Sequence, residues 1–480
     1  MQLVMSTIPK KIKALHLPTA TLLVMFFFAF LTVSAQDNSP YSRFGIGDLT
    51  PSSHNLNRAM GGISAAYGDP VTINFNNPAS YAYFQGMKEP KSKKLISGRA
   101  LFDVGIDLES RSLLQTSPVK KFKAGNALFS YIQMGVPLKK NWGLSFGLRP
   151  LSRISYNLFR NERLKDPLTG LPIDSAATTF TGDGGLYLVS MGTGFDILNK
   201  QEKRKAYMEE KLSFGINAGY LFGRNDYSSR RRLINDTVDY QQGNFETRTN
   251  LHDFYFTAGL IYKMPVDTLK KVSLSLGAYG HLGQKINATQ DILRETYVFD
   301  DALGDVRLDS VSDKTNIKGV VKLPASFTFG FAFQKPVIMI KDRKEAGWMF
   351  GVDFTMNKWD NYRFYGQKDS VKSNWEIKAG GQITPVPTKS YFSQVSYRAG
   401  FFYGPEYIQV GNKMNRFGAT FGMGLPIALN RNAPNQFTII NLAFEYMKRG
   451  NDNNKLKENL FRFSLGFSFS DIWFGKRKYD

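Results

Sequence analysis

The chain has 480 residues, no cysteine and a formal net charge of +22 at pH 7. Without cysteine it cannot form disulfides, thiolate nucleophiles, cysteine-bound zinc sites or the acylated terminus of a lipoprotein. Its 39 phenylalanines, 23 tyrosines and 43 glycines, at a mean hydropathy of -0.29, are unusual for a soluble enzyme. This composition fits strands that show one face to lipid and the other to water.

The basic residues form scattered clusters at 91–94, 203–205 and 230–232. None of these clusters lies on a recognisable nucleic-acid module, so we expect no nucleic-acid partner. Outer-membrane lipids, meaning anionic headgroups and the phosphates of an outer-leaflet glycolipid, are the expected counter-charges.

The first residues carry the pattern of a secretory signal. Three lysines in residues 10–13 precede an apolar run from Leu22 to Val33, which ends in the small-residue sequence Val33-Ser34-Ala35. The run has about 12 residues, short of the ~20 that a spanning helix needs. We predict a signal peptide over residues 1–35 and a mature start at Gln36, with a retained anchor helix as the alternative.

The next segment, residues 36–95, has no strand pattern and is too broken for a helix bundle. It contains Gly61-Gly62, Asp69-Pro70 and Asn76-Asn77-Pro78 among many small residues. An irregular segment of about 60 residues ahead of a barrel is most simply a hatch, or plug, folded into the lumen.

Residues 96–480 show repeated period-two alternation. In the clearest case, alternate positions from Phe461 to Phe469 are large and apolar, and the positions between them are Arg, Ser, Gly and Ser. A soluble sandwich also alternates, but its exposed face would carry more Lys and Glu. An open sheet in lipid leaves backbone groups unpaired, so the sheet must close. The predicted fold is all-β, a transmembrane antiparallel β-barrel.

We predict about fourteen strands, an even number as bacterial barrels prefer. They lie near 96–110, 122–137, 141–158, 183–198, 210–224, 250–263, 271–288, 322–334, 346–358, 373–384, 393–403, 415–428, 436–449 and 459–471.

The predicted connections alternate in length. Those at 139–141 and 264–269 are short, whereas 159–182, 225–249 and 289–321 are long and polar. Short periplasmic turns and long outer loops produce this alternation, which places both chain ends on the periplasmic side of the outer membrane of a Gram-negative cell.

No catalytic, cofactor or metal set is evident. The histidines of the mature chain are His54, His252 and His281, and no Ser and acid can be paired with them from spacing. Carboxylates within 289–313 are dense but lack EF-hand spacing, so we expect a solvated loop. We therefore expect no enzyme, no cofactor and no metal.

Several motifs resemble the FadL/TodX family of outer-membrane transporters of hydrophobic compounds. The most specific are Ala59-Met60-Gly61-Gly62, Ala65-Ala66-Tyr67-Gly68-Asp69-Pro70, Asn74 and Asn77-Pro78-Ala79-Ser80, and weaker ones follow in order. The weaker ones are Trp142–Ser145, Arg149–Ser152, Gly182–Gly185, Leu221–Gly223, Leu323–Ser326 and Asp353–Trp359. The resemblance implies a fourteen-stranded barrel with an N-terminal hatch. One departure is the basic tail at 473–480, because many family members end on an aromatic residue.

The resemblance implies passive uptake of hydrophobic small molecules, such as long-chain fatty acids or hydrocarbons, as the leading function. The alternative is a non-transporting scaffold or shuttle partner, because some relatives of the family serve a type IX secretion translocon. A diffusion porin for polar solutes is a third class, which the 36–95 segment disfavours.

Two sets of site residues follow. The ligand and hatch set consists of Phe75, Asn76, Asn77, Pro78, Ala79 and Tyr81, where we expect Asn side chains to satisfy buried backbone groups. An ordinary Asn-Pro turn at the periplasmic surface is the alternative for the same residues.

The second set is a lateral gate formed by Leu148, Pro150 and Leu151. Proline has no N–H to donate, so the third strand must bulge or kink at Pro150. In the family that this chain resembles, a kink in the third strand lets ligand leave sideways into the membrane. The alternative places Pro150 at the outer end of the strand, where a missing donor costs little.

Overall fold

The computed structural model describes residues 39–88, 95–116, 118–201, 209–235, 238, 240–300, 302–340, 343–427, 437–451, 453–454 and 456–473. The predicted signal peptide and the mature start at Gln36 lie outside these residues.

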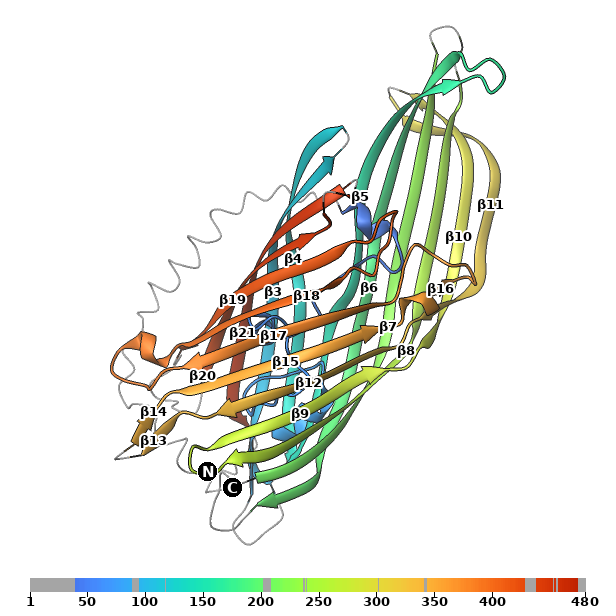
Figure 1. Ribbon diagram of the computed structural model, residues 1–480. Coiled ribbons are helices and arrows are strands. Elements are labelled where there is room, and N and C mark those ends of the chain that lie inside the picture. The colour runs from blue at the N-terminus through green and yellow to red at the C-terminus, as the bar shows by residue number, and fades with distance from the viewer. Residues whose placement is uncertain are drawn as a thin grey trace.

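Fourteen antiparallel strands close into a barrel (Figure 1), as predicted. The closure is the pairing of the last strand with the first, from Leu456 opposite Gln115 to Trp473 opposite Gly98. In chain order the wall consists of β3 (Leu95–Thr116), β4 (Val119–Lys139), β5 (Trp142–Lys165), β6 (Pro172–Gln201), β7 (Glu209–Ile234), β8 (Gln242–Asp267), β9 (Val272–His281) continued by β10 (Gln284–Asp300), β11 (Gly304–Leu323) continued by β12 (Ser326–Lys335), β15 (Gly347–Asn357), β17 (Asn374–Thr384), β18 (Ser396–Pro405), β19 (Asn415–Ile427), β20 (Phe437–Arg449) and β21 (Leu456–Trp473).

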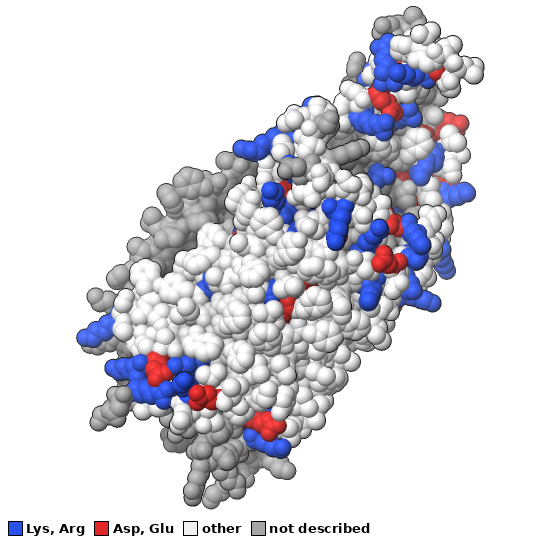
Figure 2. All heavy atoms as spheres, in the orientation of Figure 1, with Lys and Arg blue, Asp and Glu red and all other residues white. Residues whose placement is uncertain are grey.

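Side chains alternate across this wall as the sequence pattern requires. In β21, Phe461 is 60% exposed and Phe469 39%, whereas Arg462, Ser464 and Ser468 are buried. On the face seen in Figure 2, charged side chains gather toward the two ends and few lie across the middle. A closed barrel with an apolar outer band is an outer-membrane protein. Among the described residues, no helix is long and apolar enough to cross a membrane.

The three predicted long outer loops are wrong. Residues 159–182, 225–249 and 289–321 are mostly strand, because β5 and β6, β7 and β8, and β10 and β11 continue pairing to short turns near their tips. These hairpins rise beyond the rest of the barrel (Figure 1). Both faces of a strand outside the membrane can be polar, so the alternation that marks a membrane strand is lost there while the backbone pairing persists.

The N-terminal segment, defined here as residues 39–88, has short elements only: η1 (Pro40–Arg43), β1 (Asp48–Leu49), α3 (Asn55–Arg58), η2 (Pro78–Tyr83) and β2 (Gly86–Lys88). Two of them join the wall, because β1 pairs with β5 and β2 pairs with β3. Most of its residues are buried.

The largest apolar cluster lies between the N-terminal segment and the inner faces of the strands around β6–β11. Tyr41 and Ile46 of the segment pack there with Trp359 of η3 (Trp359–Asn361), which follows β15. The remaining elements are β16 (Arg363–Phe364), η4 (Tyr391–Gln394) and the two-stranded hairpin β13 (Ile338–Ile340) with β14 (Arg343–Glu345).

Candidate functional site

Asn77 fastens the N-terminal segment to the wall. Its Oδ1 accepts the backbone N–H of Ala79 at 3.1 Å and so caps η2. Its Nδ2 donates to the carbonyl oxygens of Ala65 at 2.6 Å and of Leu260 in β8 at 3.1 Å. The side chain thus satisfies buried backbone groups on both partners.

Inward glycines allow this close approach. A Cβ on Gly215 of β7 would lie 2.2 Å from the carbonyl carbon of Pro78, and one on Gly259 of β8 would lie 2.1 Å from Asn77 Oδ1. Any larger residue at these positions would displace η2 from the wall.

Phe75 and Tyr81 belong to a small buried apolar cluster. Its members come from the segment and from β3 and β4: Ile73, Phe75, Tyr81, Phe84, Leu101 and Tyr131. The rings of Phe75 and Tyr131 have centroids 5.2 Å apart. Arg149, just before Pro150, lies 4.9 Å above the Phe75 ring and donates to Asn76 Oδ1 at 3.2 Å.

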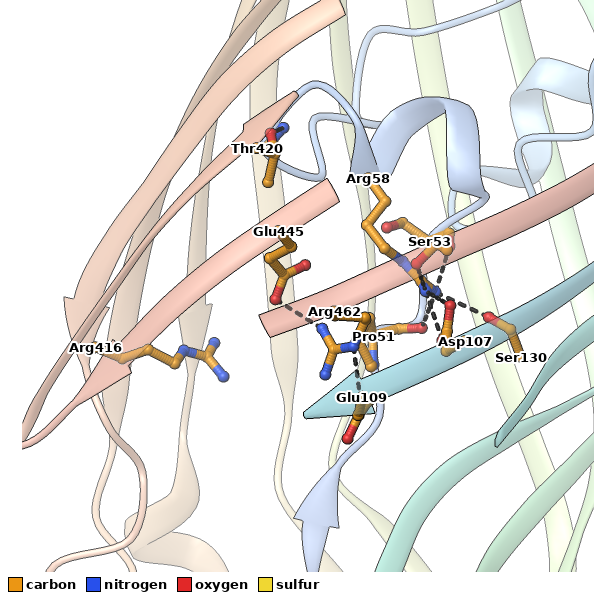
Figure 3. Close-up of polar contacts among 12 residues, drawn as sticks. Pro51, Ser53, Arg58, Asp107, Glu109, Ser130, Arg416, Thr420, Glu445 and Arg462 are labelled. Carbon is orange, nitrogen blue, oxygen red and sulfur yellow. Dashed lines mark hydrogen bonds and ion pairs between the residues drawn. The ribbon is translucent and has the colours of Figure 1, made fainter. Parts of the chain in front are cut away.

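A set of buried ion pairs ties the segment to the opposite wall. Arg58, at the end of α3, donates from Nη1 to both carboxylate oxygens of Asp107 at 2.5 and 2.6 Å and to Ser464 Oγ at 3.1 Å. Its Nη2 donates to Ser130 Oγ at 3.0 Å and to the carbonyl oxygen of Ser53 at 3.1 Å. Figure 3 shows this guanidinium enclosed by its acceptors.

Asp48 of β1 makes a second connection. Its carboxylate accepts from Arg111 of β3 at 2.8 Å and from Arg449 of β20 at 2.8 Å. Glu458 of β21, fully buried, pairs with the same two arginines, at 2.6 Å and 3.5 Å. Glu406 lies 3.0 Å from Arg449.

Two further groups of buried ion pairs join wall strands to one another. Arg462 bridges Glu109 and Glu445 at 2.7 Å each (Figure 3). Glu376 accepts from Arg416 at 2.6 Å and from Lys378 at 3.0 Å. We call this whole set the lumen network: Asp48, Arg58, Asp107, Glu109, Arg111, Glu376, Lys378, Glu406, Arg416, Glu445, Arg449, Glu458 and Arg462.

Among the described residues, one cavity inside the barrel is small and has a mixed polar and apolar lining. Its volume is about 300 Å³. Its charged lining comes mainly from the lumen network, including Arg58, Glu376, Glu406 and Arg462. Leu151, Tyr255 and other apolar residues complete its lining.

The wall changes at the predicted kink. Pairing between β4 and β5 runs from Lys139 opposite Trp142 to Ile132 opposite Leu148, and the described residues pair no further. Against its other neighbour, β6, strand β5 has a register shift between Pro150 and Ser152. Beyond this point β4 and β5 diverge (Figure 1).

The N-terminal segment takes the edge that β5 presents. Asp48 and Leu49 align with Arg153 and Ser152. The Thr50 N–H donates to the carbonyl oxygen of Leu151 at 3.2 Å.

A cavity of about 810 Å³ lies between this edge and β4. Pro150 lines it together with Ala127–Ser130, and the charged residues Asp107, Glu109 and Arg462 contribute to it. Leu151 instead packs against the large apolar cluster, and Leu148 forms the last pair with β4.

Sequence reasoning missed the lumen network. A signal was present in β3, where Asp107, Glu109 and Arg111 occupy alternate positions and so share one face. No group of three or more His, Asp or Glu side chains that could hold a metal ion occurs among the described residues.

The sequence matches one family model along most of its length. That model, described as BamG, matches residues 16–480. No curated protein matches the sequence.

Similar solved structures include members of the family that the motifs resemble. The toluene transporter TodX of Pseudomonas putida has 14% identity and a TM-score of 0.45, over 89% of this chain and 99% of that one. A Pseudomonas aeruginosa FadL homologue has 12% identity and a TM-score of 0.47, over 90% and 100%. CymD, a monoaromatic hydrocarbon channel, has 11% identity and a TM-score of 0.44, over 88% and 98%.

Proposed function

Because one family model spans nearly the whole sequence, the chain belongs to the BamG family, and we propose that it is a sealed outer-membrane barrel that docks partner proteins instead of transporting solutes. In this proposal residues 36–95 form the plug, with Phe75, Asn76, Asn77, Pro78, Ala79 and Tyr81 among its contacts. The outer surface and the strand edges then carry the function.

The lumen network is the observation that supports this proposal. A hydrophobic ligand needs a continuous apolar path, since a charge that faces it without a partner is desolvated at high cost. The cavity of about 300 Å³ inside the barrel has the charged residues Arg58, Glu376, Glu406 and Arg462 in its lining. Breaking one buried ion pair costs about 3–5 kcal/mol, and an apolar ligand offers no replacement hydrogen bond. Passage along the barrel axis is therefore opposed at several points.

The test is uptake by the full-length protein reconstituted in lipid vesicles. We expect a fluorescent long-chain fatty acid to enter no faster than into empty vesicles, and planar bilayers to show no steady conductance. The control is Arg343→Gln, which removes an exposed pair with Glu345 in the β13–β14 hairpin, away from both cavities, and should match the wild type. Saturable uptake by both proteins would overturn the proposal.

A second candidate is the uptake of hydrophobic small molecules through a lateral gate. Two observations favour it: the apolar cluster that contains Phe75 and Tyr81, and the end of β4–β5 pairing close to Pro150. In this candidate Leu148, Pro150 and Leu151 form the gate, and ligand enters the membrane without crossing water. Its test is the same assay with Phe75→Ala, which should slow saturable uptake.

A further inference from the structure

The outer half of β4 is a strand with one unpaired edge. Its residues pair with β3 from Val119 opposite Thr116 to Gly135 opposite Leu101, but with β5 only from Ile132 onward. In the described part of the chain, residues 119–131 therefore have a ladder on one side only. We call this stretch the β4 edge.

Much of the β4 edge lies at the level of the apolar band. Gly125 aligns with Ser110 of β3 and through it with Phe461 of β21, and Phe129 aligns with Ile106 and then Leu465. In hydrocarbon there is no water to bond free N–H and C=O groups, so open sheet edges do not occur facing lipid. A guest strand would satisfy the N–H and C=O groups of the β4 edge with backbone hydrogen bonds, which an acyl chain cannot form.

The edge of β5, across the gap from β4, shows how the fold pairs free backbone groups at this wall break. The β5 edge is covered by the N-terminal segment, through β1 and the hydrogen bond of Thr50 to Leu151. The cavity between that segment and the β4 edge has a volume of about 810 Å³. Room for further chain thus lies beside the edge that is still unpaired.

The β4 edge also lacks the usual protection against strand pairing over most of its length. Native edge strands are commonly blocked by proline, charge or a bulge. Residues 124–131, Ala-Gly-Asn-Ala-Leu-Phe-Ser-Tyr, contain no proline and no charge, and their register against β3 shifts only once, at Ser130. Only the outer end is charged, with Lys120, Lys121 and Lys123, all exposed.

We propose that the β4 edge binds an extended, acidic-ended segment of another protein by strand addition. This proposal rests on the proposed docking function and names the surface and the partner chemistry. The guest strand runs antiparallel to β4, as β5 does further down. Its C-terminal end therefore lies beside the three lysines and carries carboxylates, while alternate apolar side chains face lipid beside Phe129.

A second copy of this chain is a less suitable partner for the β4 edge. Two copies in one membrane have the same orientation, so a two-fold axis along the membrane normal would set two β4 strands parallel, unlike the antiparallel ladder that β4 forms with β5. Lys120, Lys121 and Lys123 of both copies would then face one another across the contact, and like charges directly opposite are destabilising.

The experiment uses the full-length protein in lipid nanodiscs and a synthetic probe. The probe is a fluorescent peptide of about twelve residues, long enough to span the β4 edge, that alternates Val with Thr and ends in glutamates. We expect it to bind and to slow amide hydrogen exchange within 124–131. A matched peptide that ends in lysines should bind about tenfold more weakly, as three rim charge pairs would give.

Charge reversal provides the decisive variant. In K120E/K121E/K123E the preference between the two peptides should invert, whereas K139E/K140E, at the other end of β4 and in the turn that follows it, should leave it unchanged. Absence of binding, or binding that ignores the reversal, would overturn the proposal. So would dimers of the peptide-free protein in which 124–131 is already protected, since a second copy would then be the occupant.

The outcomes separate this proposal from the sealed-barrel proposal. Fatty-acid uptake together with charge-selective peptide binding would overturn the sealed barrel and leave strand addition standing. A barrel without uptake and without peptide binding would overturn strand addition alone.

Discussion

Replacing Arg58 with alanine removes the contact that joins the N-terminal segment to three strands at once. The side chain donates to Asp107, Ser130 and Ser464, on β3, β4 and β21. Alanine also leaves the carbonyl oxygen of Pro51, 2.9 Å from Arg58 Nη2, without this donor.

Most of the expected loss of stability arises at Asp107, which remains buried without its cation. Removing one partner of a buried pair costs about 3–5 kcal/mol. Typical proteins have about 5–15 kcal/mol of total stability, so this loss is a large share of it. We expect Arg58→Ala to lower the free energy of unfolding by about 4 kcal/mol. The N-terminal segment should also become accessible to protease, because its connection to the wall is broken.

The assay is equilibrium urea unfolding of the protein in lipid, combined with limited proteolysis. The matched control is Arg58→Met with Asp107→Leu, since replacing both members of a buried pair by apolar residues is often nearly neutral. It should therefore recover most of the lost stability. A change within about 0.5 kcal/mol for Arg58→Ala, typical of surface substitutions, would refute the reasoning.

Three further predictions test the same region. Asn77→Leu should lower the free energy of unfolding by about 3 kcal/mol, because it leaves buried partners such as the Ala65 carbonyl oxygen unsatisfied; an unchanged urea midpoint would count against the plug. Gly215→Val should expose η2 to protease by pushing against Pro78, while Gly243→Ala, which meets only a side chain, should not; equal protection of both would show that η2 does not pack there. Pro150→Ala should not extend the β4–β5 pairing, because β1 occupies the β5 edge. Since the chain has no cysteine, a disulfide that forms only in that variant between cysteines placed at Phe129 and Leu151, which an extended ladder would set opposite each other, would disprove this.

The barrel could be predicted from sequence because its physical cause is local. Alternation in β21, such as Phe461 beside Arg462, follows from a strand between lipid and lumen, and every predicted strand has its counterpart. Outside the membrane this cause disappears, so the strands within 159–182 and 289–321 appeared as polar loops. Their pairing depends on two strands together and leaves little signal in the sequence of either strand.

The lumen network could not be predicted for a related reason. Arg449 of β20 meets Asp48 of β1, about 400 residues earlier in the chain. A charge between apolar neighbours indicates an inward position, but the partner depends on how the barrel closes and where the N-terminal segment lies. The break in pairing near Pro150 is different, because proline itself removes a donor and the effect stays local.

The measurement that most directly tests the sealed barrel is a density map of the full-length protein, purified in native lipid and resolved to side chains. We predict that the lumen network is intact, with Arg58 against Asp107 and no elongated density in the cavity bounded by Glu376 and Arg462. An elongated apolar ligand between Phe75 and the wall break at Pro150, with these pairs separated, would contradict the account.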